Sequence, residues 1–541
     1  MHGLMQEHPL LVSSILRHAA RHHRGARLAS LDASGRMTRS SYPEVAARAA
    51  QLAHGLARLG VRRTDRVATL AWNTLPHLEL YYAVSGSGAV LHTVNPRLFP
   101  EQIAFILNDA QDTALFVDAS LLPVLEKIAD RLPPSLRAVV VLGAGQAPAL
   151  SVPVLSYDQL IGGEDSDYDW PALDERAASS LCYTSGTTGE PKGVLYSHRS
   201  TVLHAMAAIQ PDVFALRALD TVMPVVPMFH VNAWGLPYAA PMAGSGLVLP
   251  GPKLDPASLH TLFEGEGVTF SAGVPTLWTA LLQWLQAEPH RRFAHPPRLV
   301  VGGTALPVAV TEAFLKQYGV SILHAWGMTE ISPLGSTNSR KAETAHWSED
   351  EFLRYSRKQG RPHFGVDYRV LDDAGQPIAQ DDKAFGELQV QGHWVASGYF
   401  NRAHDHAFTE DGWMRTGDVV TLDPLGAIEI VDRAKDVIKS GGEWISSIAL
   451  ENLALKHPDV AQAAVIAVHH PKWDERPLLL VVPKPGTTPC AKSILGIYEG
   501  QVAKWWVPDA VEFVESLPMT ATGKPWKAEM KKQWQSYSLP G

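Results

Sequence analysis

One loop of small polar residues constrains the fold of this chain more than any other segment. Residues 183–194 have the sequence YTSGTTGEPKGV, and eight of these twelve residues are Ser, Thr, Gly or Lys. The loop follows a short apolar run over residues 177–182. A strand that ends in such a loop directs backbone N–H groups and hydroxyls toward an anion, and glycine lets the chain approach it closely. We therefore expect a nest for a polyphosphate, to which Lys192 adds a positive charge.

The loop differs from a Walker P-loop. That pattern needs a Lys directly after its second Gly, followed by Ser or Thr. Here Glu190 and Pro191 come before Lys192, and a glycine follows it. A solvated turn of polar residues is the alternative interpretation, but the length and order of this loop favour phosphate binding.

The composition argues against several classes of function. The 541 residues are 46% hydrophobic and 19% charged, which is typical of a globular protein with one or several domains. The formal net charge of −8 argues against a nucleic-acid partner. Cys182 and Cys490 have no metal-binding spacing and favour a reducing compartment. The first residues lack a cationic head followed by an apolar core, so we expect no signal peptide and a cytoplasmic location.

The segment 221–252 contains no Asp, Glu, Lys or Arg, as a transmembrane span would. Its six prolines would break a membrane helix repeatedly. We therefore expect no transmembrane segment here, and we interpret these residues as buried strands and loops that line an apolar cavity.

Helical and extended patterns alternate along the chain. Apolar spacing predicts helices over residues 10–24 and 42–59, and apolar runs predict strands over 66–71 and 138–142. This alternation predicts the α/β class with largely parallel sheets. From about residue 437 the pattern indicates a smaller α/β domain, with its clearest strands at 463–468 and 478–483.

Five further motifs follow the loop. They are PMFHVNAW (227–234), HAWGMTE (324–330), WMRTGD (413–418), DRAKDVIKSGGEWIS (432–446) and LPMTATGK (517–524). With the loop, they resemble the signature of the adenylate-forming enzymes, which include acyl-CoA synthetases, firefly-type luciferases and peptide-synthetase adenylation domains. The resemblance covers essentially the whole chain and is strongest to bacterial medium- and long-chain fatty-acid–CoA ligases.

The resemblance implies two domains. A large N-terminal domain of stacked α/β subdomains, residues 1–432, binds AMP and the acyl group. A small mobile C-terminal α/β lid, residues 433–541, turns about a hinge near Lys435.

The resemblance also implies site residues. The catalytic residues are Lys524, Glu330 and Thr184, of which Glu330 and Thr184 hold Mg²⁺. ATP or AMP contacts Thr184, Ser185, Gly186, Thr187, Thr188, Gly189, Lys192, Gly303, Thr304, His324, Ala325, Trp326, Thr329, Asp418, Arg433, Lys435, Lys439 and Trp444. The acyl group contacts His230, Val231, Trp234, Gly302, Gly327 and Met328, with Trp278 along the same pocket, and coenzyme A contacts Gly441, Gly442 and Glu443.

Several of these residues have a simpler structural explanation. Trp234 serves as the gate of the acyl tunnel by resemblance, but core packing is the alternative. Solvation is the alternative for Lys524, and loop flexibility is the alternative for the paired glycines. The family more often has Tyr at the position of Trp326 and Gln or Glu at that of His324. Trp326 still offers a flat face for adenine, whereas His324 makes a pH-dependent nucleotide affinity conceivable.

The implied reaction has two halves. A carboxylate attacks the α-phosphate of Mg·ATP to give acyl-adenylate and pyrophosphate, and the thiol of coenzyme A then displaces AMP. Medium- or long-chain fatty acids are the first expectation for the acid, followed by a short thioether acid such as methylthiopropionate or an aryl-alkanoic acid. A homodimer is expected from the resemblance. The rivals are a luciferase-like oxygenase, an acyl-AMP ligase that loads a carrier protein, and a non-catalytic nucleotide-binding regulator.

Overall fold

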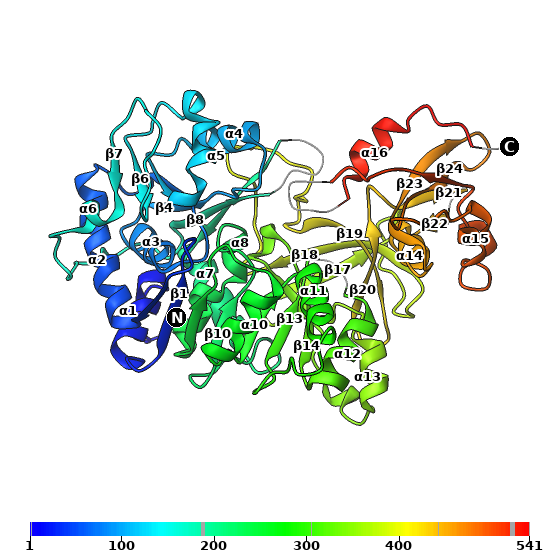
Figure 1. Cartoon of the computed structure of the whole chain (residues 1–541), viewed down its shortest axis with the longest axis horizontal. Coiled ribbons are helices and arrows are strands. Elements are labelled where there is room, and N and C mark those ends of the chain that lie inside the picture. Colours follow the sequence, from blue (N-terminus) through cyan, green and yellow to red (C-terminus); the bar gives the residue numbers. More distant parts are fainter. Residues whose placement is uncertain (2, 185–189, 304–305, 442, 520–524, 540–541) are drawn as a thin grey trace. The chain divides into compact units, whose positions relative to one another are not determined.

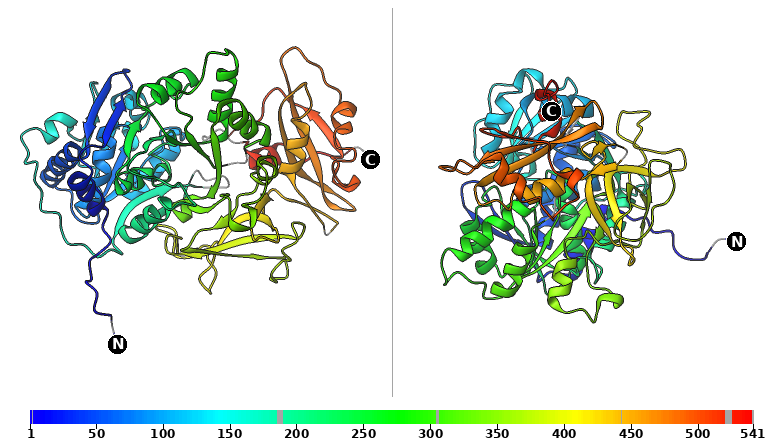
Figure 2. Two further views of the ribbon diagram at one scale, coloured as in Figure 1. Left: turned by 90° about the horizontal axis from the view of Figure 1, so that it is seen from below. Right: turned by 90° about the vertical axis from the view of Figure 1, so that its right-hand side faces the viewer.

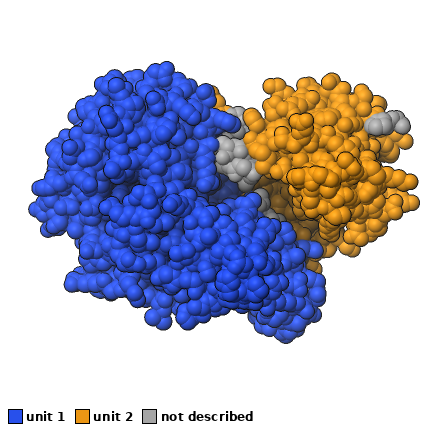
Figure 3. Space-filling view, viewed as in Figure 1, with its two compact units in different colours: residues 1–184, 191–367, 391–408 blue, residues 185–190, 368–390, 409–541 orange. Residues whose placement is uncertain are grey.

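The computed structural model describes residues 1, 3–184, 190–303, 306–441, 443–519 and 525–539. The chain divides into two compact units (Figure 3). Unit 1 comprises residues 1–184, 191–367 and 391–408, and unit 2 comprises residues 185–190, 368–390 and 409–541. Both units combine helices with sheets, so the predicted α/β class is confirmed. Among the described residues, no helix is long and apolar enough to span a membrane.

A seven-stranded sheet occupies one part of unit 1 (Figure 1). All of its neighbouring strands are parallel except the last pair. Its strands, in spatial order, are β7 (Val154–Ser156), β6 (Ala138–Leu142), β5 (Ala114–Asp118), β3 (Arg66–Leu70), β4 (Val90–Thr93), β8 (Ala178–Tyr183) and β9 (Gly193–Ser197).

A nine-stranded sheet forms the second part of unit 1. Its strands from β14 to β1 are parallel, and β15, β16 and β2 are antiparallel additions at the two edges. In spatial order they are β16 (Arg361–Pro362), β15 (Leu334–Thr337), β14 (Ser321–Gly327), β13 (Arg298–Val301), β12 (Phe270–Gly273), β10 (Thr221–Pro224), β11 (Gly246–Leu249), β1 (Arg27–Leu31) and β2 (Met37–Ser41).

Helices cover these sheets, and the longer ones follow ordinary helix rules. The predicted helices at 10–24 and 42–59 are α1 and α2, and α2 begins after Ser41, whose hydroxyl accepts from the backbone N–H of Glu44. Residues 3–9, before α1, extend away from unit 1 without regular structure (Figure 2). The helices are α1 (Val12–His22), α2 (Tyr42–Arg58), α3 (Leu75–Gly86), α4 (Pro100–Ala110), α5 (Leu122–Glu126), α6 (Tyr157–Ile161), α7 (His198–Ala208), α8 (Val231–Trp234), α9 (Leu236–Ala243), α10 (Pro256–Gly265), α11 (Pro275–Gln286), α12 (Val308–Tyr318) and α13 (Glu349–Tyr355).

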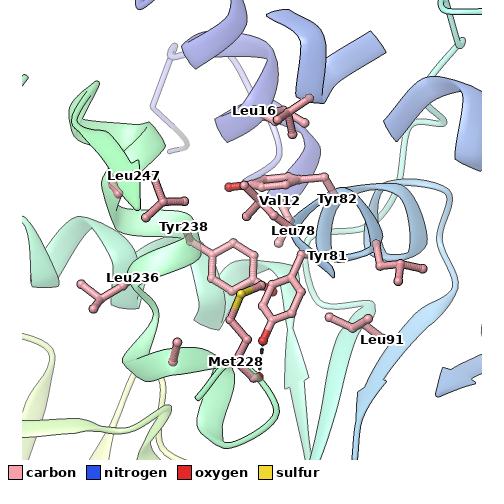
Figure 4. Close-up of a cluster of buried hydrophobic side chains, with 14 of the residues drawn as sticks. Val12, Leu16, Leu78, Tyr81, Tyr82, Leu91, Met228, Leu236, Tyr238 and Leu247 are labelled. Carbon is pink, nitrogen blue, oxygen red and sulfur yellow. Dashed lines mark hydrogen bonds between the residues drawn. The ribbon is translucent and has the colours of Figure 1, made fainter. Parts of the chain in front are cut away.

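Helix α3 lies in the main hydrophobic core. Every residue of α3 except Pro76 is buried, as expected for a helix that is apolar all round. The core cluster joins side chains of α3, such as Leu78, to side chains of both sheets, including Leu91 of β4 and Leu247 of β11 (Figure 4). The helix therefore fixes the two sheets of unit 1 to a common core.

Helix α9 corrects one expectation. Residues 221–252 are not only strands and loops, because α9 forms within them in spite of Pro241 in its interior. A proline there leaves the carbonyl four residues earlier without its helical donor. That carbonyl belongs to Pro237, and the hydroxyl of Tyr82 on α3 donates to it at 2.7 Å. A long-range hydrogen bond thus compensates for the local defect.

Unit 2 contains two smaller sheets. One has the order β17 (Val366–Leu371), β18 (Phe385–Gly392), β19 (Met414–Leu422) and β20 (Ile428–Arg433). The other has the order β22 (Glu443–Ile445), β21 (Ile438–Ser440), β24 (Asp474–Pro483) and β23 (Val460–His470), with β25 (Ala510–Phe513) parallel to β24. Its helices are α14 (Ser447–Ala454), α15 (Ala491–Gly496) and α16 (Lys527–Gln533). The strands predicted at 463–468 and 478–483 lie within β23 and β24.

Candidate active site

The phosphate loop is held at both of its ends by a β-hairpin. Strands β8 and β9 pair antiparallel, with Tyr183 opposite Gly193. The N–H of Thr184 donates to the carbonyl of Lys192 at 2.9 Å, and the N–H of Lys192 donates to the Thr184 hydroxyl at 3.2 Å. The two candidate residues Thr184 and Lys192 are therefore fixed to each other.

Glu330 is buried beside this hairpin, on the short 3-10 turn η3 (Thr329–Ile331). Its backbone is fixed from two sides. The hydroxyl of Tyr196 on β9 donates to the carbonyl of Thr329 at 2.6 Å, and the N–H of Ala396 donates to the carbonyl of Glu330 at 2.7 Å. Strand β9 and the HAWGMTE segment are thus joined by a direct hydrogen bond.

Tyr399 orients the carboxylate of Glu330. Its hydroxyl donates to Oε1 of Glu330 at 2.7 Å. Burial and the neighbouring Glu330 charge raise the pKa of Tyr399 well above its ordinary value, so the hydroxyl keeps its proton and remains a donor. The ammonium of Lys192 lies 4.7 Å from the centre of the Tyr399 ring and pairs with Asp405. Tyr399 is not among the residues predicted from the sequence, because no local motif contains it.

The HAWGMTE segment begins on β14 and continues into η3. Trp326 is buried with its ring over Gly335, where an added Cβ would lie 2.3 Å from the ring. Gly327 is required sterically, because a Cβ there would lie 1.9 Å from the carbonyl oxygen of Pro333. Ala325 and Thr329 are buried, and Met328 is half-buried. Adenine stacking on Trp326 stays a prediction.

His324 does not titrate near neutral pH, although a histidine side chain ordinarily does. Burial lowers the pKa of His324 to about 4, and its Nδ1 lies 3.3 Å from the carbonyl oxygen of Ser356. The imidazole is therefore neutral across the physiological range. A nucleotide affinity that changes with pH near neutrality is not expected from this residue.

The PMFHVNAW segment contains an unusual turn. Val231, Asn232, Ala233 and Trp234 have φ values of 46°, 51°, 48° and 55°, and Gly235 follows with φ 76°. We call residues 231–234 the left-handed turn. This conformation costs roughly 1–2 kcal/mol for each L-residue and is normally adopted by single residues. Four consecutive residues therefore need stabilising contacts from elsewhere in the fold.

The left-handed turn places Trp234 against Gly302. A Cβ at Gly302 would lie 2.9 Å from Cη2 of Trp234 and 3.1 Å from the carbonyl oxygen of Ala325. Trp234 and His230 are half-buried, whereas Val231 is buried. Gly303, next to Gly302, has φ 88°, which favours glycine at that position. The candidate acyl residues 234 and 302 therefore lie against each other, and together with the adjacent left-handed turn that carries residue 231 we call them the wall.

Trp278 does not belong to this wall. It is 0% exposed, packs over Gly273, and donates from its indole N–H to the carbonyl of Val300 at 3.1 Å. Its core cluster contains Leu299 and Val301, while Trp234 packs against the cluster that contains Val300. Successive residues of a strand point to opposite faces, so Trp278 lies on the far side of the sheet. The expectation that it lines the acyl pocket is wrong, because it fills the core.

The remaining described candidates lie in unit 2. The carboxylate of Asp418 is buried, and its Oδ1 lies 3.0 Å from Nε of Arg433, the residue opposite it in the β19–β20 pair. Burial lowers the pKa of Lys435. The ammonium of Lys439 lies 5.0 Å from the centre of the Trp444 ring. Lys439 and Trp444 thus lie opposite each other in the β21–β22 pair.

The glycine at 441 has a clear steric role. Gly441 has φ 62°, its N–H donates to the carbonyl of Trp473 at 2.8 Å, and a Cβ there would lie 2.8 Å from the Trp473 ring. Of Glu443 only the backbone is described, in β22. The predicted residues Ser185, Gly186, Thr187, Thr188, Gly189, Thr304, Gly442 and Lys524 lie outside the described residues.

A buried ion pair that the sequence analysis missed holds the end of the chain. The ammonium of Lys527, on α16, lies 2.6 Å from the Glu451 carboxylate and donates to the Ser447 hydroxyl at 2.6 Å. The Ser447 hydroxyl in turn donates to Asp432 at 2.6 Å. Burial favours the neutral amine, but the charges of Glu451 and Asp432 outweigh it and raise the pKa of Lys527. No motif distinguishes Lys527 from other lysines near the C-terminus.

Comparison with known proteins places this site in context. A family model described as AMP-binding enzyme matches residues 16–400, and one described as AMP-binding enzyme C-terminal domain matches residues 449–524. The chain is 49% identical to 3-methylmercaptopropionyl-CoA ligase of Ruegeria lacuscaerulensis over 99% of both chains. It is 47% identical to medium-chain-fatty-acid–CoA ligase of Ectopseudomonas oleovorans, over 99% of this chain and 98% of that one.

Two further similarities concern sequence and fold. Identity to long-chain-fatty-acid–CoA ligase of Thermus thermophilus is 48%, over 93% of this chain and 92% of that one. The crystal structure of the anthranilate CoA ligase AuaEII with anthranoyl-AMP superimposes with a TM-score of 0.83 at 23% identity, covering 98% of this chain and 99% of that one. At that identity the superposition shows a shared fold.

Proposed function

The chain belongs to the AMP-binding enzyme family and is an acyl-CoA ligase, and we propose that its acid is an unbranched fatty acid of medium or long chain. One observation supports this choice most directly. The segment 221–252 has no charged residue, and it supplies the wall of buried apolar side chains that includes Val231 and the half-buried Trp234. Such a wall suits an uncharged tail and disfavours a second carboxylate or an amine on the acid.

The contact of Trp234 with Gly302 favours the medium-chain end of this range. No side chain fits between them in this conformation, so a tail that lies along the wall meets an aromatic barrier. A short thioether acid is the second candidate, because a relative with 49% identity is named for 3-methylmercaptopropionate. A thioether is also uncharged and apolar, so the same wall accommodates it.

We assign the nucleotide to the phosphate loop and to the motifs that contain Trp326 and Asp418. Thr184 and Lys192 flank residues 185–189, and a nest of this kind holds the phosphates by backbone N–H groups. Trp326 offers a face for adenine, and Asp418 offers a carboxylate for the ribose hydroxyls. Coenzyme A is assigned to the passage at 441–443.

Magnesium fits the oxygen ligands that the chain provides. Glu330 supplies a carboxylate whose direction is set by Tyr399, and Thr184 supplies a hydroxyl. Two protein oxygens suffice, since Mg²⁺ keeps several waters and takes its other ligands from phosphate. The bound ion would neutralise phosphate charge. Within the described residues, no group of three or more His, Cys, Asp or Glu side chains forms a metal site of its own.

The chain's own groups perform the reaction mainly by positioning and charge. The substrate carboxylate attacks the α-phosphorus, the bond to pyrophosphate breaks, and Lys524 stabilises the charge that develops between them. The thiolate of coenzyme A then attacks the acyl carbon, and AMP leaves. We propose that residues 433–541 turn near Lys435 between these steps, so that Lys524 serves the first and Gly441 the second. A homodimer and a cytoplasmic location belong to the same proposal.

A graded acid panel tests the proposal. Pyrophosphate and AMP release are measured with and without coenzyme A, from propionate to long fatty acids, with methylthio- and phenyl-alkanoates added. A single optimum among medium or long chains with CoA-dependent AMP release supports the proposal. An optimum at methylthiopropionate selects the second candidate, and pyrophosphate release that is indifferent to coenzyme A overturns the choice of acceptor.

A further inference from the structure

Asn232 supplies the one carboxamide side chain of the left-handed turn, and both of its polar atoms contact other elements of the fold. It is buried, and its amide nitrogen donates to the hydroxyl of Ser180 on β8 at 3.0 Å. Its carbonyl oxygen accepts from the thiol of Cys182 on β8 at 3.5 Å and lies 3.3 Å from the hydroxyl oxygen of Tyr81 on α3. Both polar ends of one side chain are therefore used, by two different secondary-structure elements.

The carbonyl groups around the turn are held by the same helix. The hydroxyl of Tyr81 donates its proton to the carbonyl of Met228, just before the turn, as Figure 4 shows. Just after the turn, Tyr82 donates to the carbonyl of Pro237. Farther upstream, the Asn73 side chain donates to the carbonyls of Pro224 and Val226. The turn is thus held by hydrogen bonds before and after it, and the side chain of Asn232 holds it from within.

The residue type agrees with the geometry. Asparagine tolerates positive φ better than other L-residues, apart from glycine. Val231 is β-branched, and such residues strongly avoid this conformation. The turn therefore depends on Asn232 both for its φ and for its two hydrogen bonds.

We propose that Asn232 is a positioning residue that determines acid specificity. Its carboxamide locks the left-handed turn, and the locked turn holds the Trp234 ring against Gly302. The backbone of the turn then presents the Trp234 ring to the tail of the acid at one depth. Without the lock, the turn relaxes toward ordinary φ, Trp234 moves, and acids of different length are distinguished less well. This inference rests on the proposed function of the wall as the acyl site.

The test compares two substitutions that remove the same carboxamide. Asn232→Gly keeps a residue that adopts positive φ freely, whereas Asn232→Ala does not. We expect Asn232→Ala to raise the KM for the preferred acid about ten-fold, as for the loss of buried hydrogen bonds, and to flatten the chain-length profile. Asn232→Gly should lose less. The KM for ATP should stay within about two-fold in both, since the residues proposed to bind the nucleotide lie outside the turn.

A control and a partner variant separate positioning from general damage. Asn108→Ala on α4 removes an amide that donates to the carbonyls of Ala104 and Arg131, each at 2.8 Å, away from the turn. It should leave the chain-length profile unchanged. Ser180→Ala should mimic Asn232→Ala in part, and the double variant should lose no more than Asn232→Ala alone, because the two residues act as one unit.

The outcomes are distinct. Parallel rises in the KM for acid and ATP, or an unchanged chain-length profile in both Asn232 variants, would overturn the positioning role. If no acid is turned over by the unaltered chain, the proposed function fails, and a crystal structure of the Asn232→Ala chain still decides the inference. Retention of positive φ at residues 231–234 with Trp234 on Gly302 would refute it, and a relaxed turn with a displaced ring would support it.

Discussion

Adding one methyl group at Gly302 is a direct test of the wall formed with Trp234. The Cβ of an alanine would lie 2.9 Å from Cη2 of Trp234 and 3.1 Å from the carbonyl oxygen of Ala325. Ordinary contacts of this kind are 3.4–4 Å long, so the indole must shift by about half an ångström. Gly302 does not have positive φ, so the effect is steric and involves no backbone strain.

The expected size of the effect follows from overpacking. Extra methylene groups in a packed site cost about 1–3 kcal/mol, and each 1.4 kcal/mol corresponds to about ten-fold in an equilibrium or specificity constant. We therefore expect Gly302→Ala to lower kcat/KM for the preferred acid by roughly 5- to 140-fold. The optimum should move to shorter acids, and the KM for ATP should change little.

The assay is initial-rate AMP release across the acid panel, with thermal unfolding measured in parallel. Gly265→Ala, at the end of α10, is the matched control, because its Cβ would meet nothing within 4 Å. Trp234→Phe combined with Gly302→Ala should restore part of the loss, since phenylalanine does not reach as far. An unchanged acid profile in Gly302→Ala, or an equal rise in the KM for ATP, would refute the reasoning.

Three further outcomes are expected. Tyr399→Phe removes a hydrogen bond to the Glu330 carboxylate, so the Mg²⁺ concentration for half-maximal pyrophosphate release should rise roughly ten-fold. Lys524→Ala should slow adenylation by roughly 10²–10³-fold, while thioester formation from supplied acyl-adenylate stays nearly unchanged. Acidification should destabilise the fold, because burial lowers the pKa of His77 to about 4 and that of His204 to about 3. Between these pKa values and 6.5, the unfolded chain binds more protons than the folded chain does. The stability that the two neutral histidines contribute is therefore complete above pH 6.5 and is lost as the pH falls, by roughly 3 kcal/mol for His77 alone.

Each of these outcomes has its own check. Tyr318→Phe on α12 is the control for Tyr399, and equal Mg²⁺ dependence in both would contradict the orienting role. For Lys524→Ala, equal losses of rate in adenylation and in thioester formation would contradict a role of Lys524 in adenylation alone. For the histidines, urea unfolding at pH 7.5, 6 and 5 gives the free energy of unfolding directly. A free energy that does not change over this range would show that the buried imidazoles are not neutral in the fold.

Local patterns predicted the elements that depend on local interactions. The predicted strand at 138–142 is β6, and the predicted helix at 42–59 is α2, which ends at Arg58. Apolar periodicity and the hydroxyl of Ser41 are sufficient for such elements. Thr184 likewise follows directly after the end of a strand, as the pattern of the loop predicted.

Long-range contacts account for what was missed. Helix α9 depends on Tyr82, and the left-handed turn depends on Tyr81 and Ser180, which are far from it in sequence. The difference between Trp234 and Trp278 depends on which face of a strand each one covers. Neither a period nor a motif contains that information, because both describe neighbours along the chain and not across the core.

The buried Lys527 pair has a consequence for how the protein is made. Lys527 reaches Ser447 across 80 residues of chain, and it is the cation for Glu451 and Asp432. During synthesis, those carboxylates leave the ribosome long before Lys527 does. A buried carboxylate without its cation is strongly unfavourable, so unit 2 closes only after Lys527 has been synthesised. A nascent chain stalled before α16 would present a folded unit 1 with an unfinished unit 2, which is the form that chaperones and proteases would recognise.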